Sequence, residues 1–387
     1  MSKSKAIVPQ TQARTNSRPR LGLLIVLLIN LVSWLWFIVF RNPSAAHEST
    51  PPSPSLFHAP TEPSVPIKNP WKVPDRLSHI YVKLASDHYY GTLPIPSQMV
   101  EPLARIRITN QTRIEAFKDG VVIYCDSFYA DQFVTDVLPR IKSRFVLVTG
   151  DSNLCMPKCR LTYWGTRAIV QNPNLIYWWT SHCEGTNIGM GKIGCMPLGI
   201  DQHGTARFSM QKVYEEGFGL VRGVEQRIVP WDERPERYLL VSFQISTNRT
   251  VRGPLHDLLC GGGSNVTIPD KIQALRQVSN CFYQKDMKKQ MFYKNVLAPS
   301  RFVVAPAGAG PDSYRVYEAL LLGSYPIVKT SSLDVVFKDL PVLIVQDWTD
   351  LTVERLERAY RDFQSRHFDF RTLYTDYWRQ KFRSHLG

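Results

Sequence analysis

The chain has 387 residues, with 47 Lys and Arg against 33 Asp and Glu and a net charge of +14. Six basic residues and no acidic residue fall within the first 41 positions, so the remainder carries a net charge of only +8. This mild excess suits anionic ligands such as nucleoside diphosphates, acidic glycans or membrane head groups. Nucleic-acid binding is disfavoured, because the sequence has no repeat of aromatic and basic residues.

Residues 21–40 form an apolar run that only Asn30 and Ser33 interrupt. As a helix the run would be roughly 30 Å long, which is enough to cross the hydrocarbon core of a membrane. Five Lys and Arg residues precede it, which places residues 1–20 in the cytoplasm and the bulk of the chain on the other side. We therefore expect an uncleaved type II signal-anchor. A cleaved signal peptide with small residues at 44–46 is the alternative, but the run is longer than such a signal needs.

Residues 41–72 are rich in Pro, Ser and Thr. Such a composition cannot bury a core, so we expect a disordered, semi-rigid stem between the anchor and a globular body. Three Asn-x-Ser/Thr sequons, at Asn110, Asn248 and Asn265, fit a secretory route with the body in the lumen.

All seven cysteines lie in the body, where an oxidising compartment permits disulfides. Because their number is odd, one cysteine is free or bonded to another chain, and the sequence therefore permits a covalent homodimer. Cys155 and Cys159 have a spacing seen in zinc sites. No second close pair accompanies them, and we expect no metal.

The body is too long for one typical core, which predicts two domains. In the first, residues 73–221, a helical pattern covers residues 130–142. Apolar runs predict its strands at residues 120–124, 145–148, 168–171 and 176–179. Alternating strands and helices are typical of a Rossmann-like domain with a parallel sheet.

The second domain, residues 222–350, begins with a polar linker at residues 222–236. Its expected strands are residues 238–243, 302–305, 326–328 and 342–345. Its expected helices are residues 254–260, 288–298 and 312–322. The order strand, loop, helix, strand is that of a βαβ unit, and residues 351–387 then form one or two amphipathic helices.

A Pro- and Gly-rich loop at residues 306–311 follows the strand at residues 302–305, at the edge where parallel sheets bind ligands. The helix start beyond it favours an anion such as a diphosphate. Arg315 and Glu318 are three residues apart and share one helix face. Because arginine suits phosphate and a carboxylate suits ribose hydroxyls, we expect a nucleotide-linked ligand. A plain surface ion pair is the alternative.

The remaining residues of this motif have roles that follow from its geometry. Gly308 and Gly310 would let the backbone approach the ligand without obstruction. Asp312 is expected to cap the following helix. Ser313 and Tyr314 would supply helix-start amides beside the phosphates or the base.

The run AGAGPDSYRVYEALLLGSYPIV resembles the donor-binding motif of the exostosin-like glycosyltransferases. The matching positions are Gly308, Gly310, Asp312, Arg315, Glu318, Ala319, Leu321, Leu322, Gly323, Pro326 and Val328. The resemblance covers about residues 237–350 and is loose in the first half of the body. It implies an α/β fold of the GT-B type, in which two Rossmann-like domains face a cleft and the last helix returns to pack on the first domain.

The resemblance also implies a reaction. Together with the anchor and stem, it describes a type II glycosyltransferase of the Golgi or ER membrane. Such an enzyme would move a sugar from a nucleotide sugar, in most cases a UDP-sugar, to a glycan or glycoprotein acceptor, with inversion and without an essential metal or other cofactor. Family members often pair, which suits a homodimer. Arg252 takes the place of a family arginine that contacts the diphosphate, although a solvated charge at a helix start is the alternative.

A general base would come from the first domain. Asp126 and Asp151 follow two of its predicted strands and are the candidates, although both could equally be turn or capping residues. His182 and His203 are weaker candidates. A non-catalytic member that binds glycans or nucleotide sugars, and a nucleotide-using epimerase of similar fold, remain as other classes. If the loop at Asn248 faces the donor, a glycan there would obstruct the cleft, so we expect that sequon to be unoccupied or to point away.

Overall fold

The computed structural model describes residues 77–92, 100–151, 153–189, 191–201, 238–261, 269–283 and 287–385. The chain divides into two compact units, Met1–Pro54 and Ser55–Gly387, and every described residue belongs to the second. The expected tail, anchor, stem and linker, together with His203 and Asn265, lie outside the described residues. Among the helices that the structure describes, none has the length and apolarity needed to cross a membrane.

The first sheet is fully parallel, with the strand order β1-β2-β3-β5-β7. Its strands are β1 (His88–Tyr90), β2 (Val121–Asp126), β3 (Phe145–Gly150), β5 (Leu175–Thr180) and β7 (Ile193–Cys195). Every residue of β2 and β3 is buried. Such continuous burial explains why these strands are apolar runs rather than alternating ones, since parallel sheets are covered on both faces.

Helices cover this sheet, and one of them corrects a prediction. The bounds are α2 (His79–Ala85), α3 (Val100–Ile106), α4 (Ala130–Gln132), which continues as helical turns to Arg140, and α5 (Tyr163–Val170). The strand predicted at residues 168–171 is wrong, because most of it is the last turn of α5. Thr162 caps α5 by accepting from the Gly165 N–H, and the short apolar pair Ile169–Val170 is its buried face.

The second sheet is also fully parallel, with the strand order β12-β11-β10-β8-β9. Its strands are β8 (Leu239–Val241), β9 (Ser279–Cys281), β10 (Phe302–Val304), β11 (Tyr325–Lys329) and β12 (Leu343–Val345). Central β10 sets Phe302 opposite both Leu239 and Tyr325. Four of these strands lie where the apolar runs predicted them, and β9 was not predicted.

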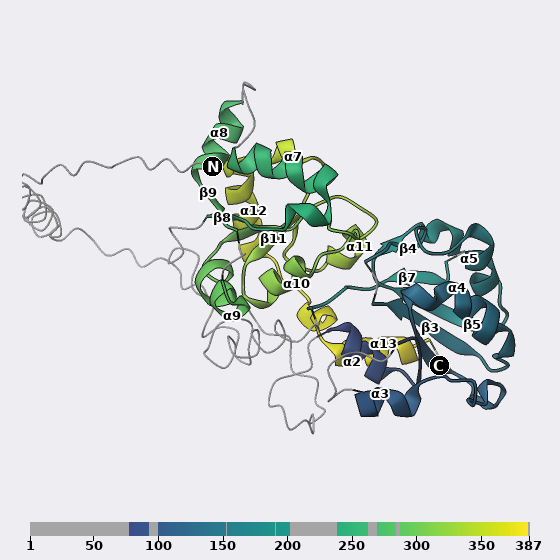
Figure 1. Ribbon diagram of the computed structural model, residues 1–387. Helices are drawn as coiled ribbons and strands as arrows, with labels where there is room; N and C mark the ends of the chain where they lie inside the picture. The colour runs from purple at the N-terminus through teal and green to yellow at the C-terminus, as the bar shows by residue number, and fades with distance from the viewer. Residues whose placement is uncertain are drawn as a thin grey trace, which may run out of the picture. The chain divides into compact units, whose positions relative to one another are not determined.

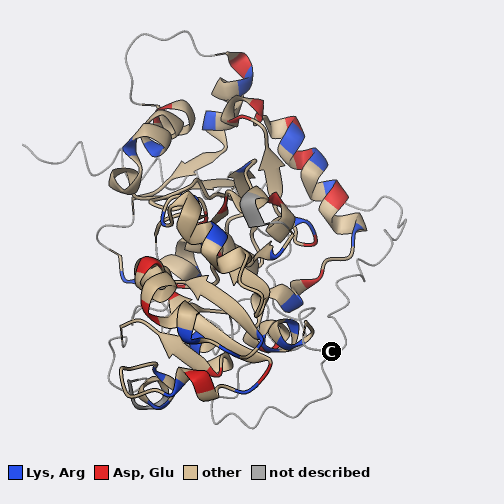
Figure 2. Ribbon diagram, turned by 90° about the vertical axis from the view of Figure 1, so that its right-hand side faces the viewer, with Lys and Arg blue, Asp and Glu red and all other residues tan. Residues whose placement is uncertain are grey.

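Between residues 238 and 337 the structure describes five α-helices. Three of them were predicted, although the one at residues 249–260 begins five residues earlier than expected, and those at residues 270–277 and 334–337 were not predicted. The five helices are α7 (Arg249–Cys260), α8 (Asp270–Gln277), α9 (Lys289–Phe292), which continues as a helical turn to Leu297, α10 (Tyr314–Leu321) and α11 (Asp334–Phe337). Figure 2 shows Lys and Arg interspersed with Asp and Glu along the described elements, which fits the small net charge of the body.

The two C-terminal helices pack on different sheets. Helix α12 (Val353–Ser365) buries Leu356 and Phe363 in the core of the second sheet. Helix α13 (Thr375–Arg383) lies against α2 and buries Trp378 and Phe382 in the core of the first sheet (Figure 1). The end of the chain therefore returns to the first sheet, so both sheets depend on the C-terminal segment for their cores.

Six of the seven cysteines form disulfides, namely Cys155–Cys159, Cys183–Cys195 and Cys260–Cys281. Cys125 is the free one, and it is fully buried on β2. A buried thiol cannot reach a second chain in the folded state. The expectation that the odd cysteine could support a covalent dimer is therefore corrected.

Candidate functional site

A cavity of about 550 Å³ lies at the carboxyl ends of the strands of the second sheet. Its walls come from both halves of the body: Asn153, His182 and Leu198 from the first, and the segments after β8 and β10 from the second. Seven residues that the sequence nominated as donor contacts all line it: Arg252, Gly308, Gly310, Ser313, Tyr314, Arg315 and Glu318. The motif therefore faces one cavity that is open to solvent, at the edge where parallel sheets bind ligands.

The start of α10 faces this cavity, and its cap is not the expected one. Ser313 is the N-cap residue, and its hydroxyl accepts from the Arg315 N–H. Asp312 is buried instead, and its Oδ2 accepts from the Tyr317 hydroxyl at 2.6 Å and from the Leu198 N–H at 3.0 Å. Burial raises the pKa of Asp312 to about 6, against the effect of these hydrogen bonds. Asp312 thus joins α10 to the segment that leaves the first sheet.

Glu318 and Arg315 form an ion pair within the cavity wall, with 3.0 Å between Oε2 and Nη1. The Tyr293 hydroxyl donates to the other oxygen, Oε1, at 2.7 Å, and the Arg315 guanidinium lies 4.5 Å from the centre of the Phe292 ring. The ion pair between Arg315 and Glu318 that was considered as an alternative to ligand binding therefore exists. It is not a surface pair, however, because both side chains are largely buried. Each carboxylate oxygen has two lone pairs and so can still accept from a ligand hydroxyl.

Arg252 is fastened to the Gly-rich loop rather than extended into solvent. Its guanidinium donates to three carbonyl oxygens: Ala307 at 2.9 Å, Pro306 at 3.0 Å and Gln244 at 3.0 Å. Burial, together with the nearby Arg315 charge, lowers the pKa of Arg252 to about 10. Since a guanidinium has five N–H donors, at most two remain for a ligand, and the main effect of Arg252 is to shape the loop.

The two loop glycines are needed for packing against protein atoms. A Cβ at Gly308 would lie 2.9 Å from Nη2 of Arg252, and one at Gly310 would lie 2.5 Å from Nδ1 of His182. We expected glycine at these two positions because a ligand would approach the backbone closely. The contacts with Arg252 and His182 are a second reason for glycine. The loop rests directly on Arg252 and on a residue of the first domain.

His182 is held in a defined tautomer. Its Nδ1 accepts from the Asp312 N–H at 3.2 Å, and its backbone has φ of 49°. Burial, and then the nearby His79, lower its pKa to about 3, so the ring is neutral and its proton is on Nε2. The acceptor nitrogen is already in use, and this argues against His182 as a general base.

The two candidate bases share one buried lysine, Lys83 of α2. Its Nζ lies 2.8 Å from Oδ1 of Asp126 and 2.5 Å from Oδ2 of Asp151. Asp126 is buried and also accepts from the Tyr89 hydroxyl and the Thr92 N–H; burial raises its pKa to about 6 in spite of Lys83. Asp151 has φ of 57° at the end of β3, and 23% of its side chain is exposed. Neither carboxylate lines the cavity, although Asn153 beside Asp151 does.

Asn248 belongs to the same loop network. Its Oδ1 accepts from the Val251 N–H and so caps α7, and its Nδ2 donates to the Gly308 carbonyl at 2.9 Å. Asn110, in contrast, is exposed on a turn between Thr109 and Thr112. The side-chain nitrogen that a glycan would modify is therefore hydrogen-bonded at Asn248. Asn110, by comparison, is exposed.

We expect Asn248 to be unglycosylated in the secreted or membrane-bound chain, because a glycan on Nδ2 would break the bond to Gly308 and stand against the cavity loop. Mass spectrometry of peptides after enzymatic deglycosylation in heavy-oxygen water measures the occupancy of each sequon. Asn110 is the internal comparison. High occupancy of Asn248 in folded, ligand-binding protein would contradict this assignment of the loop.

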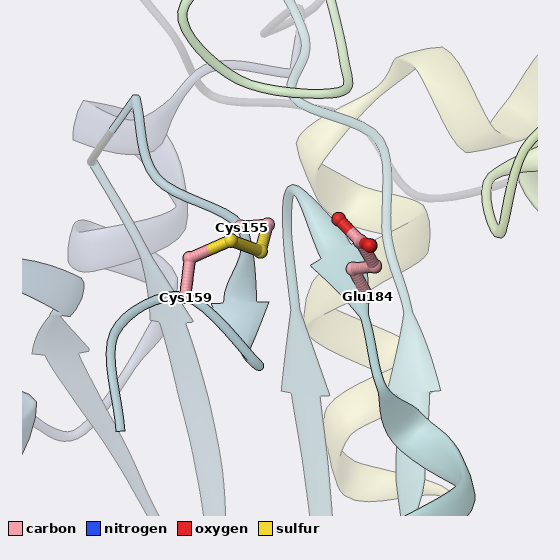
Figure 3. Close-up of side chains that lie close together, drawn as sticks. All are labelled: Cys155, Cys159 and Glu184. Carbon is pink, nitrogen blue, oxygen red and sulfur yellow. A yellow bond between two sulfur atoms is a disulfide. The ribbon is translucent and has the colours of Figure 1, made fainter. Parts of the chain in front are cut away.

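Cys155, Cys159 and Glu184 lie close together (Figure 3). The two sulfur atoms are bonded to each other, and Glu184 is paired with Lys158. A disulfide offers no thiolate ligands, so the zinc alternative for this spacing does not fit.

The parallel sheets and the cavity at their carboxyl edge define an α/β protein with a candidate ligand site. Residues 267–387, which include α10 and Glu318, match the family model described as RXYLT1 C-terminal domain. No curated protein gives a significant match to the chain. One similar solved structure is an α,α-trehalose-phosphate synthase (UDP-forming) from Burkholderia xenovorans in complex with glucose-6-phosphate. It has 10% identity and a TM-score of 0.33, with 76% of this chain and 79% of that chain covered.

Proposed function

We propose that the protein is a glycosyltransferase that moves a sugar from a nucleotide-sugar donor to a glycan or glycoprotein acceptor. The observation that carries the proposal is the gathering of the Gly-rich loop, the start of α10, Arg315 and Glu318 around one cavity. The RXYLT1 C-terminal domain match over residues 267–387 supports the same class. The expected anchor at residues 21–40 adds a type II location in the Golgi or ER membrane to the proposal.

The donor would be held by its nucleoside diphosphate. In this proposal Glu318 accepts from the ribose hydroxyls, and the diphosphate lies against the start of α10 and the Arg315 guanidinium. Negative charge grows on the diphosphate as it leaves the anomeric carbon. Preorganised amides and a guanidinium stabilise this charge. We propose that they do so without an essential metal ion.

The acceptor hydroxyl would attack the anomeric carbon in one displacement with inversion, and a base would take its proton. Asp151 is our candidate, because its side chain is partly exposed at a strand end whereas Asp126 is buried and bonded on both oxygens. Its positive φ is of the kind that accumulates at functional sites. Lys83, which pairs with one oxygen of Asp151, would orient this carboxylate.

A non-catalytic member that only binds its ligand is the second candidate. The observation in its favour is that neither Asp126 nor Asp151 lines the cavity. The two candidates differ in turnover, because a transferase hydrolyses its donor slowly when no acceptor is present. Release of UDP or GDP from the corresponding sugar nucleotides therefore separates them.

The proposal is tested with the full chain, purified in detergent and heated with a panel of UDP- and GDP-sugars in the presence and absence of EDTA. A donor at 100 times its dissociation constant stabilises the folded state by about 2.7 kcal/mol, which a thermal shift detects. We expect one nucleotide class to stabilise the protein and the shift to survive chelation. If no sugar nucleotide stabilises well-folded protein, the donor site is wrong.

A further inference from the structure

Tyr283 is an exposed aromatic residue at the cavity that no part of the sequence motif includes. It follows the carboxyl end of β9 by two residues, lines the cavity and leaves 67% of its surface exposed. A tyrosine ring left in contact with solvent keeps apolar area exposed. In a cavity wall such a ring offers a flat face to a ligand.

The two residues before Tyr283, Cys281 and Phe282, make three contacts with the rest of the structure. The Phe282 N–H donates to the Val241 carbonyl at 3.0 Å, which extends the β8–β9 pairing. Cys281 forms a disulfide with Cys260 at the end of α7. The Phe282 ring packs 5.9 Å from that of Phe292, the ring beneath Arg315. The two residues before Tyr283 are thus held in place, and Tyr283 itself lines the same cavity as Arg315 and Glu318.

The other aromatic side chains of the cavity are less suited to stack on a ligand. Phe243 has the Arg252 guanidinium 5.6 Å from its ring centre. Tyr314 is in the first turn of α10, where the phosphates are expected, and it is more buried than Tyr283. Among the described residues that line the cavity, Tyr283 is the aromatic side chain with most of its surface exposed.

We propose that Tyr283 stacks on the nucleobase of the donor, an assignment that rests on the proposed function. A nucleotide consists of phosphates, a ribose and a base. In the proposed function Arg315 and the start of α10 hold the phosphates and Glu318 holds the ribose, which leaves the base without a contact. The base is flat and follows the ribose, and every base has a face that an aromatic ring can stack on. Tyr283 follows β9, the edge strand that pairs with β8. It therefore lies at the opposite end of the sheet from β11 and β12.

The test compares binding of UDP and GDP with binding of inorganic pyrophosphate, which lacks both ribose and base, to the full chain in detergent. In Tyr283→Ala the dissociation constant of the preferred nucleotide should rise about 10- to 100-fold, as for loss of other base–aromatic stacks. Pyrophosphate binding should stay unchanged. Tyr283→Phe keeps the ring and should bind like the original protein.

The matched control is Tyr163→Ala, which removes a tyrosine that is 51% exposed on α5 and does not line the cavity. It should leave all three affinities unchanged. Wild-type binding of a nucleotide with no loss in Tyr283→Ala overturns the stacking role and leaves the proposed function standing. An equal loss of nucleotide and pyrophosphate also overturns it, because the residue would then act on the cavity as a whole. If the wild-type chain binds neither nucleotide, the proposed function fails together with this inference.

Discussion

Glu318→Ala is expected to weaken nucleotide binding by at least about 100-fold. In the proposed complex the Glu318 carboxylate accepts from two ribose hydroxyls, and each hydrogen bond to a charged group is worth about 1.5–3 kcal/mol. Together they exceed the roughly 2.7 kcal/mol that corresponds to a 100-fold change. The substitution also leaves the buried Tyr293 hydroxyl without its acceptor and Arg315 without its carboxylate. Isothermal titration of the full chain with UDP and GDP measures the effect.

Two further variants separate a ligand contact from a structural role. Glu115→Ala removes a carboxylate that also pairs with an arginine, Arg140 at 2.8 Å, but on an exposed surface away from the cavity. It should leave nucleotide affinity unchanged. Glu318→Gln keeps the shape and one acceptor oxygen, so its affinity should fall between those of the wild type and Glu318→Ala. Unchanged nucleotide affinity in Glu318→Ala, with the wild type binding, would remove Glu318 from the donor site.

The second sheet could be predicted well because its central strands are continuous apolar runs. The stretch from β10 to β11 is punctuated by a Pro- and Gly-rich loop and by Gly323, so both strand ends are visible in the sequence. Edge strand β9 has the sequence Ser-Asn-Cys and no apolar pattern. It forms because it pairs with β8, a tertiary effect that a local pattern does not contain.

In the candidate site, too, contacts between residues close in sequence could be predicted, and contacts made by tertiary packing could not. Arg315 and Glu318 are close in sequence, and their helical spacing predicts a shared face. Lys83, in contrast, is 68 residues from Asp151, with which it pairs. Tyr293 reaches Glu318, and Tyr283 reaches the cavity, only through the packing of segments that are distant in the sequence. A lysine in a helical pattern is most often a solvated residue, so no sequence signal marked Lys83 as buried.

Lys83→Met is expected to destabilise the folded protein by about 3–5 kcal/mol at neutral pH, the usual cost of breaking a buried ion pair from one side. Lys83 is fully buried between the carboxylates of Asp126 and Asp151, and its removal leaves the buried Asp126 charge uncompensated. The thermal midpoint should fall by roughly 6 °C or more. Lys158→Met is the matched control, because Lys158 pairs with Glu184 but is 62% exposed. The control should lower the midpoint by about 2 °C or less, since exposed pairs contribute little.

The loss in Lys83→Met should depend on pH in a direction set by Asp126. Burial raises the pKa of Asp126 to about 6, above its value near 4 in an unfolded chain. The folded state therefore binds the proton more tightly, and the contribution of Asp126 to stability falls as the pH rises from about 4 through 6. Without Lys83 the pKa of Asp126 in the folded state rises further. At pH 5 the Asp126 carboxyl is then neutral, and burying it costs little free energy. We expect the difference in thermal midpoint between wild type and Lys83→Met to be clearly larger at pH 7.5 than at pH 5. An equal difference at both pH values would mean that Lys83 acts through packing and not through its charge.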